Sequence, residues 1–96
     1  MPSATVHISA ADLDLIGAYE SVGDVLYLSA QDDDKTGVAQ ETPEGHAVRL
    51  GPTGQITHIT AINARWFLDR DGEVVATLRD GRQLRLGRSD LAELVC

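Results

Sequence analysis

Glycines and Asp-Gly pairs interrupt this chain at short, regular intervals, a spacing that favours short strands over helices. A chain of 96 residues supports one domain. Aromatic residues are few, so the core must consist mainly of Val, Leu, Ile and Ala. The sequence therefore predicts a single domain over residues 1–96 that is mostly β and borders on α+β. We expect an antiparallel β-meander of six to eight short strands with a short C-terminal helix. A small core of this kind often gains stability by oligomerising, and we expect a homo-oligomer.

The first half of the chain contains three candidate strands. The residue pattern predicts strands over residues 5–9 and 15–19. Residues 25–30 are apolar on both faces, which is typical of a strand at the centre of a sheet. Residues 9–14 fit either a helix start with a capping box or a strand. The acidic segment 32–37 is predicted to be a solvated loop.

A four-residue turn that contains a proline, residues 51–54, predicts a hairpin between the segments on either side. We expect Leu50 to pair with Gln55 across this turn. Because side chains alternate along a strand, His46 and His58 then point to opposite faces of the hairpin. Two histidines so placed cannot bind one ion, and no metal site is expected.

Two later turns, residues 70–72 and 79–81, share the sequence Arg-Asp-Gly. A three-residue loop that ends in glycine suits a type I turn closed by a residue in the left-handed region. A two-residue closure of the second turn would place Arg79 opposite Arg82, a destabilising pair of like charges. The three-residue closure instead puts a set of apolar side chains on one face of the hairpin: Val74, Ala76, Leu78, Leu84 and Leu86.

The same pairing logic predicts a strand through residue 66. It places Trp66 and Leu68 on the core face and Phe67 on the opposite face, beside Val75. An exposed aromatic residue next to a valine is a candidate contact surface. Phe67 and Val75 are therefore predicted to form a subunit interface.

The chain closes with a helical pattern. Ser89 or Asp90 is a suitable N-cap, and Leu91, Leu94 and Val95 fall on one helical face. A helix of barely two turns is marginal alone, so we expect it to dock on the sheet.

Acidic charge is concentrated in the first half of the chain. Residues 1–48 hold nine carboxylates and one lysine, a net −8, and residues 49–96 hold six carboxylates and seven arginines, a net +1, which together give −7. Such a chain repels phosphate backbones, which argues against nucleic acid as a partner. The single cysteine, Cys96, leaves no internal disulfide and suits a reducing compartment. No apolar run approaches the roughly 20 residues of a membrane helix, and a signal-peptide pattern is missing. We therefore expect a cytoplasmic protein with no membrane partner.

Patterns for catalysis or cofactor binding are missing from the sequence. The acidic run at residues 32–34 lacks the spacing of a calcium loop, and no glycine-rich phosphate motif occurs. No serine lies in a nucleophile elbow. Glu20 and Asp24 flank one turn, where capping of the turn is a simpler role than acid–base chemistry. We expect no catalytic, cofactor-binding or metal-binding residues, and an enzyme is disfavoured.

A set of residues around this turn carries a resemblance to a known family: Tyr19, Glu20, Asp24, Leu26 and Tyr27. The segment resembles the Tyr-Asp-x-x-x-Asp-x-Leu-Tyr-Ile opening of domain-of-unknown-function family 2283, a group of small, mostly bacterial proteins. A second, shorter match extends the resemblance over roughly residues 18–62. Members of this family look like partners of small toxin-like proteins in some genomes. The resemblance therefore implies a non-enzymatic, antitoxin-like binding module.

Two functions remain open on the sequence alone. The first is a non-catalytic protein-binding module, a homo-oligomer that also binds a small protein partner through a sheet edge or the Phe67 and Val75 face. The alternative is a small ligand-binding protein or enzyme with a pocket near Tyr19, Asp24 and Tyr27, completed by a histidine.

Overall fold

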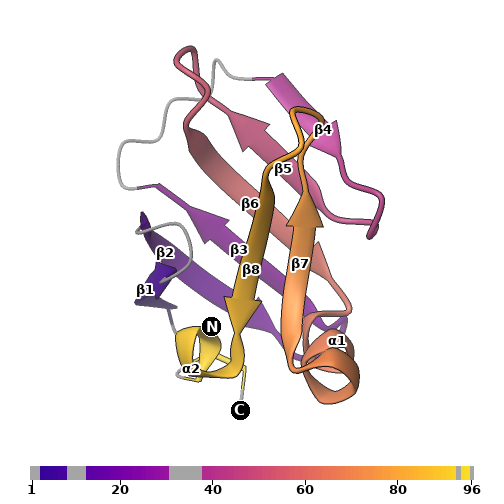
Figure 1. The fold of residues 1–96 in the computed structure, drawn as a ribbon. Coiled ribbons are helices and arrows are strands. Elements are labelled where there is room, and N and C mark those ends of the chain that lie inside the picture. The colour runs from indigo at the N-terminus through magenta and orange to yellow at the C-terminus, as the bar shows by residue number, and fades with distance from the viewer. Residues whose placement is uncertain (1–2, 9–12, 31–37, 93, 96) are drawn as a thin grey trace.

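The computed structural model describes residues 3–8, 13–30, 38–92 and 94–95 (Figure 1). Eight strands and two helices lie within these residues, and the chain is mostly β, as predicted. The strands are β1 Ser3–Ile8, β2 Leu13–Glu20, β3 Val25–Ser29, β4 Val38–Glu41, β5 Ala47–Leu50, β6 Ile56–Ile62, β7 Glu73–Thr77 and β8 Gln83–Gly87. The helices are α1 Ala64–Asp71 and α2 Arg88–Leu91.

Strands β1 to β6 form one antiparallel sheet, which we call the large sheet, in the order β1-β2-β3-β6-β5-β4. Strands β1, β2 and β3 follow one another as a meander, and β4, β5 and β6 form a second. Pairing of β3 with β6 joins the two halves. The predicted meander is thus confirmed in each half, with one non-consecutive pairing between them.

The strand predictions for the first half are confirmed where the structure describes them. The strand predicted over residues 5–9 corresponds to β1, and residues 15–19 lie within β2. The predicted central strand, residues 25–30, is β3 and lies between β2 and β6. Of the ambiguous segment 9–14, the last two residues belong to β2, and its first four residues lie outside the described part of the chain. The predicted loop at 32–37 also lies outside it.

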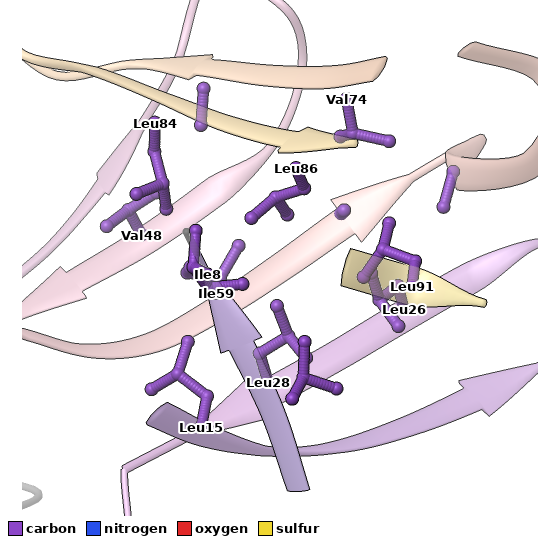
Figure 2. Packing of buried hydrophobic residues seen from close by; sticks show 14 of the residues in the cluster. Ile8, Leu15, Leu26, Leu28, Val48, Ile59, Val74, Leu84, Leu86 and Leu91 are labelled. Carbon is purple, nitrogen blue, oxygen red and sulfur yellow. The ribbon is translucent and has the colours of Figure 1, made fainter. Parts of the chain in front are cut away.

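A second layer covers one face of the large sheet. It consists of the β7–β8 hairpin, which crosses in front of the sheet in Figure 1, and of the two helices at the lower end of the view. Apolar side chains from both layers meet between them (Figure 2), and the largest buried ones are Ile8, Leu15, Leu26, Leu28, Ile59, Leu86 and Leu91. Full burial of one such side chain stabilises the fold by about 1.5–3 kcal/mol. The other face of the large sheet, which we call the outer face, is covered by none of the elements that the structure describes.

The β7–β8 hairpin closes through a three-residue loop, as predicted. The N–H of Leu78 donates to the carbonyl oxygen of Arg82 at 2.7 Å. Gly81, inside the loop, has a φ of 93°, a conformation that glycine adopts without steric cost. All five side chains predicted for the inner face of the hairpin are buried, whereas Val75 is half-buried and Arg85 exposed on the other.

The register of the β5–β6 hairpin differs from the prediction. Gly51 rather than Leu50 pairs with Gln55, through an N–H to carbonyl hydrogen bond of 2.7 Å. One residue of β6, Thr57, then bulges out of the ladder, and its hydroxyl donates to the carbonyl oxygen of Arg49 at 3.2 Å. Because the shorter loop and the bulge each move the pairing by one residue, the side chains beyond the bulge keep their predicted faces.

The segment predicted to be a strand through Trp66 is a helix, and that prediction is wrong. Residues 70–72, predicted to be a hairpin turn, lie at the C-terminus of α1. Gly72 has a φ of 77°, and its N–H donates to the carbonyl oxygen of Leu68 at 2.9 Å. Such a left-handed glycine is a common way for a helix to end.

The helix changes which side chains of this segment are buried. Ala64 and Leu68, one helical turn apart, face the core. Trp66 is exposed and Phe67 is half-buried against the core, which reverses the predicted faces of these two residues. The proposed interface placed Phe67 beside Val75 on one exposed strand face, and this arrangement is wrong because the strand does not exist.

The C-terminal segment docks on β1 of the large sheet, as predicted, and also contacts β8. Its helix, α2, is a single turn whose N-cap is Gly87 rather than the predicted Ser89 or Asp90. The carboxylate of Asp90 accepts a hydrogen bond from the N–H of Gly87 at 3.0 Å. The predicted apolar residues of this segment are all buried: Leu91, Leu94 and Val95.

Gly17 makes room for this segment on the large sheet. It is buried near the centre of β2. A Cβ atom at this position would lie 2.4 Å from Cδ1 of Leu94 and 2.8 Å from Cδ2 of Leu28. A glycine in a strand interior often marks such a close approach.

Side chains from the β4–β5 hairpin occupy the free edge of β7. The carboxylate of Glu44 accepts hydrogen bonds from the N–H of Thr77 at 3.0 Å and from its hydroxyl at 2.6 Å. The amide oxygen of Gln40 accepts one from the N–H of Arg79 at 2.9 Å. Burial opposes ionisation of Glu44, but the hydrogen bonds from Thr77 outweigh it and lower the pKa of this carboxyl group. These contacts hold the β7–β8 hairpin in place over the large sheet.

Candidate functional site

Tyr19 and Asp24, two of the motif residues, meet at the N-terminus of α1. The hydroxyl of Tyr19 donates to Oδ1 of Asp24 at 2.7 Å. The same carboxylate accepts hydrogen bonds from the backbone N–H groups of Arg65 at 2.8 Å and Trp66 at 3.2 Å. The helix lacks a side-chain cap from its own N-cap residue, Asn63. Asp24, in the β2–β3 turn, supplies that cap and places a negative charge at the positive end of the helix.

The protonation states of this pair are firmly set. Burial and the hydrogen bond to Asp24 raise the pKa of Tyr19 to about 12. Burial disfavours the charged form of Asp24, but the N–H of Arg65, the hydroxyl of Tyr19 and the N–H of Trp66 together hold its pKa below the usual value. At neutral pH Tyr19 is a donor and Asp24 a charged acceptor. In these states the contact joins β2 and the β2–β3 turn to the start of α1.

Glu20 and Leu26 also serve the fold. The carboxylate of Glu20 accepts hydrogen bonds from the N–H of Val22 at 2.9 Å and from the N–H of Gly23 at 2.6 Å. This contact caps the β2–β3 turn, the role predicted for Glu20. Leu26 is fully buried in the core. The sequence did not indicate that Asp24, on the other side of the turn, would cap a helix.

Tyr27 does not join the other motif residues. The β2–β3 register places Tyr19 opposite Leu26 and Ala18 opposite Tyr27, so the two tyrosines lie on opposite faces of the large sheet. Tyr27 points from the outer face and is 46% exposed. A pocket lined by Tyr19 and Tyr27 together therefore does not form.

His46, directly before β5, is buried, and its side chain contacts the end of β6 and a residue of α1. Its Nδ1 accepts a hydrogen bond from the N–H of Ile62 at 3.1 Å, so the ring proton lies on Nε2. Nε2 is buried and has no hydrogen-bond partner among the described residues. The ring of Phe67 lies edge-on at 5.4 Å. Burial lowers the pKa of His46, and the nearby charge of Glu44 offsets only part of this effect.

The other two histidines lie on the outer face. His58 pairs with Arg49 across β5 and β6, on the face opposite to His46, as the alternation predicted. Nδ1 of His7 lies 2.7 Å from Oδ1 of Asp14 in an exposed cross-strand contact between β1 and β2. In the described part of the chain, no three His, Cys, Asp or Glu side chains are grouped closely enough to hold a metal ion.

The outer face carries exposed apolar side chains near its centre. Tyr27 is 46% exposed, and Ile16 and Ile62 are 39% exposed each. Small or half-buried side chains lie beside them on the same face: Ala18, Val25, Ala47 and Thr60. Antiparallel sheets commonly leave one face to solvent, but that face is then usually polar. An apolar centre is instead typical of a contact surface.

A hollow of about 240 Å³ lies on this face over β4, β5 and β6, and it is lined by Ala39, Ala47, Val48, Arg49, His58 and Thr60. Thr60 pairs with Ala47 on one side and with Tyr27 on the other. Tyr27, Thr60 and Ala47 thus form one row across three strands. Small-molecule pockets usually measure about 300–1,000 Å³, and the hollow is smaller than this range.

A second exposed aromatic residue, Trp66, lies on α1 and is 51% exposed. The guanidinium carbon of Arg70 lies 4.6 Å from the centre of the Trp66 ring, and Arg70 is also paired with Asp71 at 3.0 Å. This surface was not predicted from the sequence, because Trp66 was expected on the core face. The helical spacing of Ala64 and Leu68 was the signal that could have revealed it.

The chain matches no protein-family model, curated protein or solved structure. The resemblance to family 2283 therefore remains a prediction from the motif residues. No helix in the described part of the chain has the length and apolar character needed to cross a membrane.

Proposed function

We propose that this protein is a non-catalytic module that binds another protein through the outer face of its large sheet. The observation that carries the proposal is the exposed, apolar centre of that face, where Tyr27 stands between Ile16 and Ile62. Tyrosine is enriched among the residues that contribute most to protein–protein binding. Contact surfaces also commonly have an apolar centre within a polar rim, and Glu20 and Asp14 lie at the rim of this face.

The polar groups that could have served catalysis support the proposal by their present contacts. Asp24 accepts three hydrogen bonds that position α1. Glu20 caps its own turn, and His46 accepts a backbone hydrogen bond inside the core. A catalytic site needs such groups aimed at one place that a substrate can reach. These three groups are used by the fold instead.

The predicted resemblance to family 2283 fits this role. An antitoxin-like module neutralises a small protein by covering it, which requires a surface and no chemistry. The single cysteine suits the reducing cytoplasm as the place of action.

The test compares proteins captured by three immobilised forms of the chain from a lysate of the organism that encodes it. Tyr27→Glu places a charge at the centre of the outer face, and Trp66→Glu is the matched control on α1. We expect that the native chain and the control retain a partner protein that Tyr27→Glu does not retain. A second copy of this chain counts as such a partner. The proposal would be contradicted if a partner were lost only with Trp66→Glu. It would also be contradicted if no captured protein were lost with Tyr27→Glu.

A further inference from the structure

We infer that the outer face binds a second copy of this chain in a twofold-symmetric dimer, with Tyr27 of each copy seated in the hollow over Ala47 of the other. This inference rests on the proposed function, because it uses the same face and names the partner. It follows from the position of a projecting side chain and a hollow within one surface.

The projecting side chain and the hollow lie in the same row of the sheet. Tyr27 on β3 pairs with Thr60 on β6, which pairs with Ala47 on β5. Neighbouring strands are about 4.8 Å apart, so Tyr27 and Ala47, one of the residues that line the hollow, are separated by about 10 Å across the sheet. The residue midway between them is Thr60.

Because Tyr27 and Ala47 lie at equal distances on either side of Thr60, a twofold axis can relate the two copies. A twofold axis that runs along β6, midway between two facing sheets, exchanges β3 of one copy with β5 of the other. Tyr27 then faces Ala47 of the second copy, and the symmetry repeats the contact on the other side of the axis. Such self-complementary interfaces are the commonest kind in soluble homo-oligomers.

The hollow has the right size for this contact. Its volume of about 240 Å³ corresponds to the space of about eight water molecules in the liquid, at about 30 Å³ each. The eight heavy atoms of a tyrosine side chain are joined by covalent bonds and take up less space than eight separate water molecules, so the hollow has room for the ring. Burial of that ring would remove from water the most exposed apolar group at the centre of the face.

The residues along the axis are compatible with close approach. Thr60 and Ile62 both lie on β6, so each of them faces the same residue of the second copy across the axis. Ile62 is 39% exposed in the single chain and would be covered by its counterpart. No carboxylate lies on the outer face of β6, so no acidic side chains meet along the axis.

The decisive experiment uses two complementary variants, Tyr27→Glu and Ala47→Arg, with the mass of each sample measured by light scattering over a concentration series. The native chain is expected to reach twice its monomer mass of 10.3 kDa. Each variant alone is expected to dissociate at least roughly thirtyfold more readily, as loss of a central contact residue implies. When the two variants are mixed, one contact pairs the introduced glutamate with the introduced arginine, and the other keeps Tyr27 against Ala47. The dimer is therefore expected to return in the mixture.

Far-ultraviolet circular dichroism on each variant shows whether it folds, and Trp66→Glu should leave the dimer unchanged. A native chain that stays monomeric overturns the inference, although the capture experiment can still support a different partner on the same face. If both variants still form the dimer, the inference is overturned. Self-association would then give no support to the outer face as a binding surface. A dimer lost in both variants but not restored by mixing overturns the pairing of Tyr27 with the hollow.

Discussion

The backbone N–H of Arg65 donates a 2.8 Å hydrogen bond to the carboxylate of Asp24, although the two residues lie 41 positions apart in the chain. This contact ties the β2–β3 turn to the start of α1. A helix of eight residues is too short to be stable alone, so it depends on its cap and its packing. The most conspicuous motif in the sequence therefore positions a helix in a different part of the chain.

Replacement of Asp24 should destabilise the whole domain. Asp24→Asn keeps an acceptor and tolerates the positive φ of this residue, whereas Asp24→Ala removes both advantages. We expect a loss in the free energy of unfolding of about 0.5–1 kcal/mol for Asn and about 2 kcal/mol for Ala, as for other helix caps. Urea denaturation measures both values. Tyr19→Phe, which removes only one donor to the carboxylate, should cost about 1 kcal/mol. Equal values for Asn and Ala would argue against the capping role.

His46 should make the stability of the domain depend on pH. Burial lowers its pKa in the folded protein from the ordinary value of 6.5, so below pH 6.5 the unfolded chain binds a proton that the folded chain does not. The free energy of unfolding should be unaffected by this group above pH 6.5 and should fall as the pH drops below it, with a slope of at most about 1.4 kcal/mol per pH unit. The decline from this group ends once the pH passes below the pKa of the folded state.

A variant separates this effect from the titration of carboxylates. His46→Gln retains an oxygen that can accept the hydrogen bond from Ile62 and removes the titrating ring. Urea denaturation at several pH values should show a flatter dependence for this variant than for the native chain in the interval below pH 6.5. A native curve that is flat over the same interval would rule out the buried, neutral state of His46.

Gly17→Ala should destabilise the domain by about 1–3 kcal/mol, because the new methyl group would overlap Leu94 and Leu28. The cause can be checked with a second change. Leu94→Ala removes the nearer atom, so the double variant should lose less than the sum of the two single losses. Ala18→Ser, on the other face of the same strand, serves as the control. Strict additivity in thermal or urea unfolding would show that the close approach at Gly17 is not the source of the loss.

Phe67→Ala should cost more stability than Trp66→Ala, although tryptophan is the larger residue. Phe67 packs against the core and contacts the ring of His46, so we expect a loss of about 2 kcal/mol. Trp66 is 51% exposed, and its removal should cost less than about 1 kcal/mol. Chemical denaturation compares the two. The opposite order would support the strand arrangement that the sequence suggested for this segment.

The sequence was sufficient where local patterns decide the structure. The β7–β8 hairpin was predicted residue by residue, because like charges at Arg79 and Arg82 exclude the shorter loop and glycine allows the longer one. The opposite faces of His46 and His58 were also predicted, because alternation survives a register shift of two residues. In both cases the deciding information lies within a few residues.

The sequence was insufficient where distant residues decide the structure. Helix α1 is capped by Asp24, which no local pattern of residues 63–72 reveals. The bulge at Thr57 depends on a hydrogen bond across the hairpin to Arg49. The candidate contact surface was missed for a related reason, because the exposure of Tyr27 depends on which face the second layer covers. That choice is made by packing of the whole chain.

The hydrogen bonds from Thr77 and Arg79 to Glu44 and Gln40 have a further consequence for assembly. An unpaired strand edge can template the addition of strands from other molecules, the first step towards fibrous aggregates. Here the N–H of Thr77, the last residue of β7, is already bonded to a side chain, and so is the N–H of Arg79 in the loop that follows. Growth of ordered polymers by strand addition is therefore disfavoured at the hairpin, and substitution of Glu44 would be expected to expose the protein to it.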